Sequence, residues 1–221
     1  MDLFDFAAAA APQPSAPAPI GPGAVLMRGR AAAVADALLR EIAAVAEAAP
    51  FRRMRTPGGF EMSVAMTSCG AAGWVTDRRG YRYERADPLS GRPWPAMPET
   101  FRALARDCAA EAGYPDFAPD ACLINRYEPG ARMSLHQDRD EHDLAQPIVS
   151  VSLGLPCVFQ FGGPERASPV AKHELRHGDV VVWGGPSRLF YHGVLRLKQG
   201  EHPATGAARY NLTFRKALKP A

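Results

Sequence analysis

The sequence predicts a mainly β protein with flanking helices, an α+β fold built on a sandwich or jelly-roll barrel. Short apolar segments recur at regular spacing after residue 120, and Gly/Pro turns such as EPG and GGP separate them. Two amphipathic helical patterns come before this region. The 221 residues, of which 47% are hydrophobic, are enough for one large domain with a sizeable core.

The Ala/Pro-rich run AAAAAPQPSAPAPIGPG at residues 7–23 is the first distinct segment of the chain. Its composition predicts a flexible tail, because it offers no periodic apolar face to bury. We therefore expect a tail over residues 1–23 and a single domain over residues 24–221. We expect no signal peptide and no membrane span, since early basic residues and an apolar run of about 18 residues are both missing. The four cysteines form no CxxC pair and read as small buried residues, which favours the reducing cytoplasm.

Two helices are expected before the strand-rich region. The first covers residues 31–49, where apolar residues recur at helical spacing up to a proline. The second lies in PETFRALARDCAAEAG, residues 98–113, with a proline near its start and Gly113 as its C-terminal cap. Between them, residues 51–97 are rich in Gly, Pro, Arg and aromatics, with short extended pieces such as Ser63–Thr67.

Strands are expected wherever an apolar or alternating segment lies between turn signals. The predicted strands are Cys122–Tyr127, Ile148–Leu153, Cys157–Phe161, Asp179–Trp183, Leu189–Val194 and Tyr210–Phe214.

Two His-x-Asp pairs raise the question of a metal site. In an extended SLHQDRD segment, His136 and Asp138 would point to the same face. The second pair, His177 and Asp179, flanks a glycine ahead of the apolar VVVW, which is typical of a turn. His192 in LFYHGV offers a third ligand, and two histidines with one carboxylate form the facial triad of non-haem Fe(II) oxygenases. Spacing alone leaves open that His136 and Asp138 belong to an ordinary polar turn.

The segment RYNLTFR near the C-terminus alternates polar and apolar residues. As a strand it would carry Arg209, Asn211, Thr213 and Arg215 on one face and Tyr210, Leu212 and Phe214 on the other. Unpaired buried arginines are costly. Either the polar face is solvated at a sheet edge, or its arginines bind an anion such as a dicarboxylate. Asn125 and Tyr127 share a face of another predicted strand and offer an amide and a phenol.

Long segments of the chain resemble the AlkB family of Fe(II)/2-oxoglutarate-dependent dioxygenases, which reverse alkylation damage to nucleobases. The similarity runs over about residues 24–216 and is carried by FRRMRTPGGFEMSVAMTSCGAAGW, YPDFAPDACLINRYEPGARMSLHQDRDE, PIVSVSLGLPCVFQFGG, HGDVVVWGGPSRLFYHG and RYNLTFR. It implies a double-stranded β-helix (jelly-roll) catalytic core over residues 120–216. It also implies an N-terminal nucleotide-recognition lid over residues 51–97.

The resemblance further implies a set of site residues. The catalytic Fe(II) ligands would be His136, Asp138 and His192. The 2-oxoglutarate contacts would be Asn125, Tyr127, Arg209, Asn211 and Arg215, with Arg209 at the distal carboxylate and Arg215 at the end near iron. Base and nucleic-acid contacts would fall on Trp74, Tyr81, Arg82, Tyr83, Asp140 and Arg166. Departures from the family pattern at Phe60, Met133 and His142 concern substrate preference and not the chemistry.

The implied activity is oxidative dealkylation of bases of the 1-methyladenine and 3-methylcytosine type. Fe(II), 2-oxoglutarate and O2 would be used, and succinate, CO2 and formaldehyde released. The substrate would be single- or double-stranded DNA, with RNA as a further candidate, and the protein is expected to be a monomer. The lid composition points the same way, because its arginines suit phosphates and its interleaved aromatics suit an extruded base. Asp140 is the candidate partner for a positively charged lesion.

Three alternatives stay open on the sequence alone. The chain could be another 2-oxoglutarate oxygenase that acts on RNA or on a protein side chain. It could be a non-catalytic nucleic-acid-binding jelly roll, which would need neither iron nor 2-oxoglutarate. The arginine-rich segment 51–97 could also be a mobile loop whose arginines are simply solvated.

Overall fold

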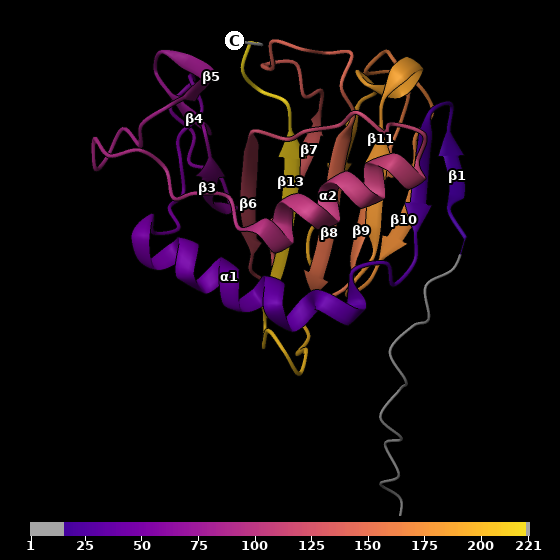
Figure 1. Ribbon diagram of the computed structural model, residues 1–221, viewed down its shortest axis with the longest axis horizontal. Coiled ribbons are helices and arrows are strands. Elements are labelled where there is room, and N and C mark those ends of the chain that lie inside the picture. Colours follow the sequence, from indigo (N-terminus) through magenta and orange to yellow (C-terminus); the bar gives the residue numbers. More distant parts are fainter. Residues whose placement is uncertain (1–15, 220–221) are drawn as a thin grey trace, which may run out of the picture.

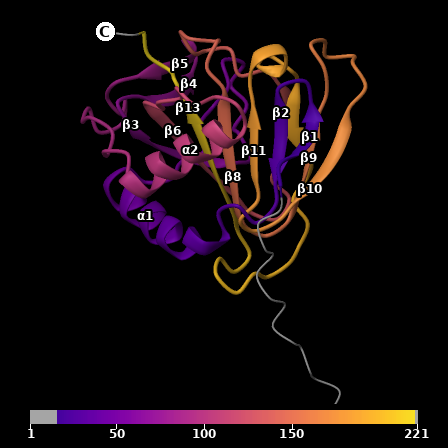
Figure 2. The same cartoon turned by 45° about the vertical axis from the view of Figure 1, so that its right-hand side comes forward.

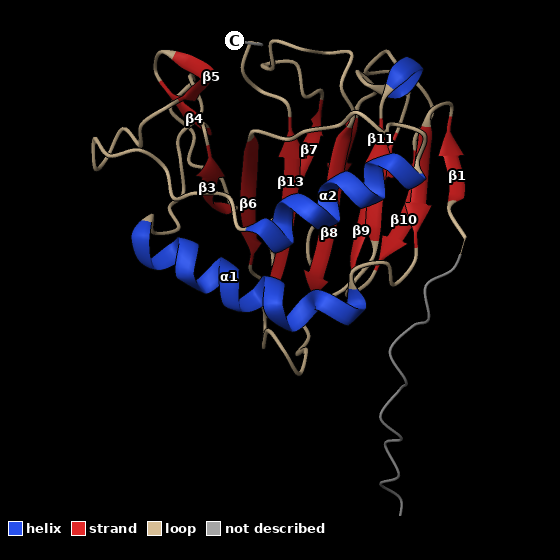
Figure 3. Cartoon of the chain, viewed as in Figure 1, coloured by secondary structure: helices blue, strands red, loops and turns tan. Residues whose placement is uncertain are grey.

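The computed structural model describes residues 16–219, which form two large β-sheets, one two-stranded sheet and two α-helices (Figures 1 and 3). The strands are β1 (Ala18–Gly21), β2 (Ala24–Met27), β3 (Ala65–Gly70), β4 (Gly73–Asp77), β5 (Gly80–Glu84), β6 (Ala121–Tyr127), β7 (Met133–His136), β8 (Ile148–Gly154), β9 (Cys157–Phe161), β10 (Ala171–Leu175), β11 (Val180–Trp183), β12 (His192–Val194) and β13 (Arg209–Arg215). The helices are α1 (Ala35–Ala48) and α2 (Glu99–Glu111), with short 3-10 turns η1 (Ala32–Val34) and η2 (Gly185–Ser187).

The two sheets face each other as the layers of a jelly roll. The larger one has the order β1-β2-β11-β8-β13-β6-β3, and the smaller one the order β10-β9-β12-β7. Neighbouring strands in both sheets are antiparallel. Strands β4 and β5 form a separate hairpin beside the β3 and β6 edge (Figure 1). The predicted mainly β fold with flanking helices is therefore confirmed.

Both helices lie on the outer face of the seven-stranded sheet (Figure 1). Helix α1 buries Leu38, Ile42 and Val45, the apolar positions that share one helix face. Phe101 of α2 packs edge-to-face against Phe214 of β13, with ring centroids 6.0 Å apart. Each such buried side chain contributes about 1.5–3 kcal/mol. Gly113 ends α2 at a φ of +92°, a conformation that glycine adopts without strain, and the predicted cap is confirmed.

A second apolar cluster fills the space between the two sheets. Trp183 of β11 packs against Phe159 and Phe161 of β9. In Figure 2, β11 and β2 lie between the helices and strands β9 and β10. This cluster therefore lies on the face of the larger sheet opposite the helices. Side chains of β13 alternate between the two faces of the sheet. Leu212 and Phe214 pack in the cluster under the helices, whereas Asn211 and Thr213 face the cavity between the sheets.

The boundary of the expected tail is wrong. Residues 18–21 form β1, which pairs with β2 at the edge of the seven-stranded sheet. The strand is short and contains a proline, which sheets accommodate at an edge, so its composition resembles that of a linker. Residues 1–15 of the expected tail lie outside the described part of the chain.

Further differences concern the strands, since β2, β4, β5 and β7 were not among those predicted. β3, which lies inside the expected lid segment, is an edge strand of the large sheet and pairs with β6. β10 was not predicted, because its mixed polar residues AKHEL lie on an edge with mostly exposed side chains. The expected strand Leu189–Val194 shortens to His192–Val194, because η2 and a turn occupy the preceding residues.

None of the helices within residues 16–219 has the length and apolar character needed to cross a lipid bilayer.

Candidate metal and cosubstrate site

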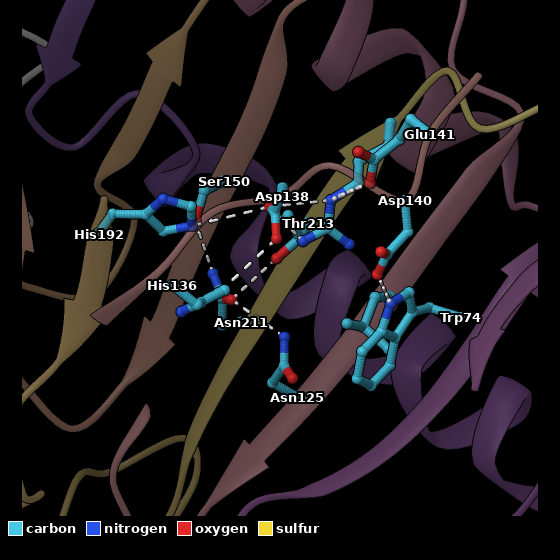
Figure 4. A network of polar contacts seen from close by, with 12 residues as sticks. Trp74, Asn125, His136, Asp138, Asp140, Glu141, Ser150, His192, Asn211 and Thr213 are labelled. Atoms are coloured by element: carbon cyan, nitrogen blue, oxygen red, sulfur yellow. Dashed lines mark hydrogen bonds and ion pairs between the residues drawn. The ribbon is translucent and has the colours of Figure 1, made fainter. Parts of the chain in front are cut away.

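Strands β7 and β12 bring two histidines together at one end of the smaller sheet. His136 ends β7, His192 begins β12, and the two are register partners in the antiparallel pair. Asp138 follows two residues after β7 and lies between them: His136 Nε2 is 3.6 Å from Oδ1, and His192 Nε2 is 3.7 Å from Oδ2 (Figure 4). The ligand atoms of all three lie within 4.8 Å of one another, so one metal ion can reach them together.

Backbone carbonyls orient both imidazole rings. His136 Nδ1 lies 2.8 Å from the Ser134 carbonyl oxygen, and His192 Nδ1 lies 3.0 Å from that of Phe190. An N–H at Nδ1 satisfies each carbonyl and leaves the Nε2 lone pair facing Asp138. Burial, and then the neighbouring His136, lower the pKa of His192 to about 4, so its ring is neutral at pH 7 and able to bind a metal.

Asp138 is held as a carboxylate by Arg215 of β13. Arg215 Nε and Nη2 both donate to Asp138 Oδ2, at 3.0 and 2.5 Å. Burial alone would raise the pKa of Asp138, but the charge and hydrogen bonds of Arg215, together with the two nearby histidines, outweigh it and keep this pKa well below its usual range. The third ligand is therefore ionised before any metal arrives.

The other predicted cosubstrate residues line one cavity beside this cluster. The cavity lies between the sheets, and Asn125, Tyr127, Arg209, Asn211 and Arg215 all contribute to its wall. Asn125 Nδ2 and Thr213 Oγ1 donate to Asn211 Oδ1 at 3.2 and 3.0 Å, while Asn211 Nδ2 donates to Ser150 Oγ at 2.8 Å (Figure 4). These bonds fix the amides on the cavity wall.

Arg209 carries a buried charge at the base of this cavity. Its exposed fraction is 1%, its Nη2 donates to Ser152 Oγ at 3.0 Å, and its guanidinium lies 4.8 Å from the centre of the Tyr127 ring. Its Nε and Nη1 have no hydrogen-bond partner among residues 16–219. A buried cation with two free donors is costly unless an anion pairs with it. The burial of Arg209 on a central strand of the sheet excludes the solvated-edge alternative, and its free donors suit a carboxylate.

The hairpin of β4 and β5 lies within the expected lid segment, and we call it the lid hairpin. It contacts the loop that follows Asp138. Trp74 Nε1 donates to Asp140 Oδ2 at 2.8 Å (Figure 4). The Tyr83 hydroxyl donates to Glu141 Oε1 at 2.8 Å. Tyr81 stacks on Trp74, with ring centroids 5.6 Å apart and an interplanar angle of 15°. Four of the predicted base contacts thus gather beside the loop that carries Asp138.

The two remaining predicted contacts lie apart from this group. Arg82 is bonded within its own hairpin, to Asp77 at 2.9 Å and to Glu84 at 2.6 Å. Arg166 is exposed, donates to the Leu135 carbonyl at 2.9 Å and lies over the Tyr191 ring. Their contact with nucleic acid stays a prediction.

The second His-x-Asp pair forms the predicted turn. Gly178 has a φ of +85°, and the buried Asp179 carboxylate accepts the backbone N–H of Gly29 at 2.9 Å. His177 Nδ1 accepts the backbone N–H of Gly154. The group of His136, Asp138 and His192 is the one set of three or more close potential ligands within residues 16–219.

Several residues of the site were not predicted. Ser150 lines the cavity and Ser152 accepts from Arg209, and the alternation of the two serines within IVSVSL was a usable signal. Glu141 and Arg188 form a buried ion pair at 3.0 Å behind Asp138, and nothing in their local sequence marks them.

The donor set fits the group that such a site would hold. Two imidazole nitrogens and one carboxylate, with no thiolate, match a facial Fe(II) triad that leaves positions free for other ligands. The unpartnered donors of Arg209 fit the distal carboxylate of a dicarboxylate cosubstrate.

Comparisons with known proteins agree with this chemistry. Residues 23–215 match the model of the 2OG-Fe(II) oxygenase superfamily. The chain is 61% identical over 201 residues to the alpha-ketoglutarate-dependent dioxygenase AlkB of Escherichia coli, covering 91% of this chain and 93% of that protein. It is 30% identical over 124 residues to the human nucleic acid dioxygenase ALKBH1, covering 56% of this chain and 32% of that protein. The solved structure of OsALKBH1 superimposes with a TM-score of 0.81 at 28% identity, covering 90% of this chain and 99% of that chain. The chain therefore belongs to the 2OG-Fe(II) oxygenase superfamily and is an Fe(II)- and 2-oxoglutarate-dependent dioxygenase.

Proposed function

We propose that this dioxygenase repairs nucleic acids by oxidative dealkylation of N-alkylated bases, with Fe(II) held by His136, Asp138 and His192. One observation carries the proposal: the three ligands and Arg209, which has two unpartnered donors, line the same cavity. A dicarboxylate that reaches from Arg209 to the ligand cluster would satisfy both. The similarity over 91% of the chain to AlkB of Escherichia coli supports the same assignment.

The cosubstrate would be oriented by the cavity wall. Arg209 would pair the distal carboxylate of 2-oxoglutarate, and Asn125 and Tyr127 would donate to its oxygens. Asn211, whose amide donates to Ser150 and Val151, would line the site and orient Asn125. Burial raises the pKa of Tyr127 to about 12, so its hydroxyl stays protonated and able to donate. Arg215 would contact the end near the metal while it holds Asp138.

The chemistry itself comes from the bound groups. Fe(II) held by His136, Asp138 and His192 would, with 2-oxoglutarate and O2, supply the insertion of one oxygen atom into a C–H bond of the N-alkyl group, with succinate and CO2 as the other products. The N-hydroxyalkyl product loses its alkyl carbon as an aldehyde, formaldehyde for a methyl group, and the base is restored. The chain's own part is to hold the alkyl carbon beside the ligand cluster and to exclude water.

The lid hairpin would supply the base contacts. A base removed from its stack can lie against the Trp74 and Tyr81 rings, whose stacked planes are 5.6 Å apart at their centroids. Asp140, beside the Trp74 indole, would attract a positively charged lesion such as 1-methyladenine or 3-methylcytosine. The human relative's name, nucleic acid dioxygenase, supports this class of substrate.

The substrate is DNA, single- or double-stranded, and RNA is a second substrate to be tested. Arginines of the lid, such as Arg55, Arg78 and Arg85, are exposed and suited to phosphates. We further propose that the protein acts as a monomer in the cytoplasm, where its four free buried cysteines would stay reduced.

The deciding experiment is a turnover assay with Fe(II) and 2-oxoglutarate that reads formaldehyde and succinate. Methylated and etheno-modified DNA, methylated RNA and a methyl-lysine peptide serve as parallel substrates, and His136→Ala serves as the control. We expect formaldehyde from the methylated oligonucleotides and none from the peptide or from His136→Ala. Preferred turnover of the peptide, or unchanged turnover by His136→Ala, would contradict the proposal.

A further inference from the structure

A buried arginine behind the ligand cluster makes three hydrogen bonds to a single loop. Arg188 follows η2 and has an exposed fraction of 3%. Its Nη1 donates to the Asp138 carbonyl at 2.6 Å, its Nε to the Gln146 carbonyl at 2.8 Å, and its Nη2 to Glu141 Oε2 at 3.0 Å. The planar fork of an arginine can hold three acceptors in fixed directions, which a lysine cannot do.

The loop that Arg188 holds has no sheet pairing of its own. It runs over residues 137–147 between β7 and β8 and carries Asp138, the one proposed ligand that lies outside a strand. His136 and His192 are set by the pairing of β7 with β12. The position of Asp138 relative to them therefore depends on contacts that cross from the loop to other segments.

A second bond lies beside the first and joins the same two segments. Gln137 Nε2 donates to the Leu189 carbonyl at 2.6 Å, next to the bond from Arg188 to the Asp138 carbonyl. Residues 137–138 are thus tied twice to residues 188–189, which lie just before His192. We call these two bonds the ligand clamp.

We propose that Arg188 is a positioning residue that fixes Asp138 against the two histidines through the ligand clamp, so that the iron site is formed before the metal binds. The inference rests on the proposed iron site. Arg188 touches neither metal nor cosubstrate in this arrangement; it acts through the backbone of Asp138. Its side-chain partner Glu141 also accepts a hydrogen bond from the Tyr83 hydroxyl. Arg188 therefore also fixes the carboxylate that the lid hairpin contacts.

Two variants separate the bonds from the charge. Arg188→Met keeps most of the side-chain length and removes all three donors, while Arg188→Lys keeps the charge but cannot reach three acceptors at once. Arg28→Met is the matched control, because Arg28 also joins a buried carboxylate, Asp179 at 2.6 Å, and a backbone carbonyl, that of Glu174, but far from the iron site. Gln137→Leu removes the other bond of the clamp and leaves Arg188 in place.

The measurement is an anaerobic Fe(II) titration with saturating 2-oxoglutarate, read from the visible absorption of the complex, alongside thermal unfolding without metal. Loss of groups that orient metal ligands weakens metal binding by about 10–100-fold. We expect Arg188→Met to raise the iron midpoint by about that factor, Arg188→Lys to fall between it and wild type, and Gln137→Leu to give a smaller increase. Arg28→Met should unfold at a lower temperature yet bind iron with the wild-type midpoint.

The results separate this inference from the assignment on which it rests. Equal midpoints for wild type, Arg188→Met and Arg188→Lys would overturn the positioning role while iron binding persists. If Arg188→Met does not fold, a wild-type midpoint in both Arg188→Lys and Gln137→Leu overturns it equally. Failure of the iron site itself would show differently, as an Asp138→Ala variant that binds iron as tightly as wild type.

Discussion

The indole N–H of Trp74 donates to the carboxylate of Asp140 at 2.8 Å, and this bond joins the lid hairpin to the loop that carries Asp138. The two residues lie 66 positions apart in the chain. Trp74 supplies an aromatic plane and Asp140 a negative charge next to it, so a flat cationic base could contact both. The bond also leaves one oxygen of Asp140 free of the indole, available to a substrate.

The charge of Asp140 is expected to select cationic lesions. Asp140→Asn keeps an oxygen that can accept from Trp74 but removes the negative charge. We expect kcat/KM for 3-methylcytosine to fall about tenfold, or about 1.4 kcal/mol, since a hydrogen bond to a charged group is worth more than a neutral one. Turnover of a neutral etheno base should change less than twofold. An equal loss on both substrates would show that Asp140 only supports the lid.

The ring of Trp74 is expected to bind the extruded base. Stacking on an aromatic side chain contributes about 1–3 kcal/mol per base, so Trp74→Ala should weaken binding of a methylated oligonucleotide about 5- to 150-fold. Trp74→Phe, which keeps a ring but loses the N–H to Asp140, should retain most of the affinity. The Fe(II) titration midpoint should be unchanged in both. Wild-type affinity and rate in Trp74→Ala would remove the stacking role.

The buried charge of Arg209 is expected to lower the stability of the fold without 2-oxoglutarate and to strengthen 2-oxoglutarate binding. Arg209→Met should unfold at the same or a higher temperature than wild type without 2-oxoglutarate, because it removes a buried cation with unpaired donors. Its KM for 2-oxoglutarate should rise about thirtyfold or more, since loss of one partner of a buried charge pair costs at least about 2 kcal/mol.

Thermal unfolding with and without 2-oxoglutarate tests both halves of this expectation. Added 2-oxoglutarate should stabilise wild type but not Arg209→Met. Ser152→Ala is the matched control, because it removes the Arg209 partner at 3.0 Å and leaves the charge in place. It should raise KM far less. A wild-type KM in Arg209→Met would place the distal carboxylate elsewhere.

The ion pair of Asp87 with Arg52 is expected to make the lid segment sensitive to acid. The two groups lie 2.7 Å apart, and Asp87 is buried. Burial alone would raise the pKa of Asp87, but hydrogen bonds from Arg52 and the Leu89 N–H outweigh it and lower this pKa below its ordinary value of 3.8. The folded state thus binds this proton less readily than the unfolded state. The stabilisation is complete above pH 3.8 and is lost as pH falls through the lower folded value.

Calorimetric unfolding of Asp87→Asn measures this contribution. At pH 7 the variant should be less stable by about 1.5–3 kcal/mol, the range for a hydrogen bond to a charged group. The difference from wild type should shrink below pH 3.8, because wild type then also carries a neutral group. A constant difference across that range would mean that Asp87 titrates alike in both states.

Much of the core could be predicted from periodicity, because side-chain direction along a strand is a local property. The alternation of β13 separated Asn211 and Thr213 from Leu212 and Phe214, and the structure puts the two sets on opposite faces. The same reasoning paired Asn125 with Tyr127. Periodicity did not predict the edge strands β1 and β10, because strands at an exposed sheet edge need no apolar pattern.

By itself the sequence determined which residue types alternate, roughly where the two helices lie, and that two His-x-Asp pairs were available. Only the tertiary structure decided that His136 and Asp138 meet His192 while His177 and Asp179 form a turn. It also showed that Arg209 is buried with free donors and that Arg188 holds the Asp138 loop from 50 residues away. The physical reason is range: propensity and alternation act between near neighbours, whereas burial, charge pairing and ligand distances depend on segments that meet only when the sheets close.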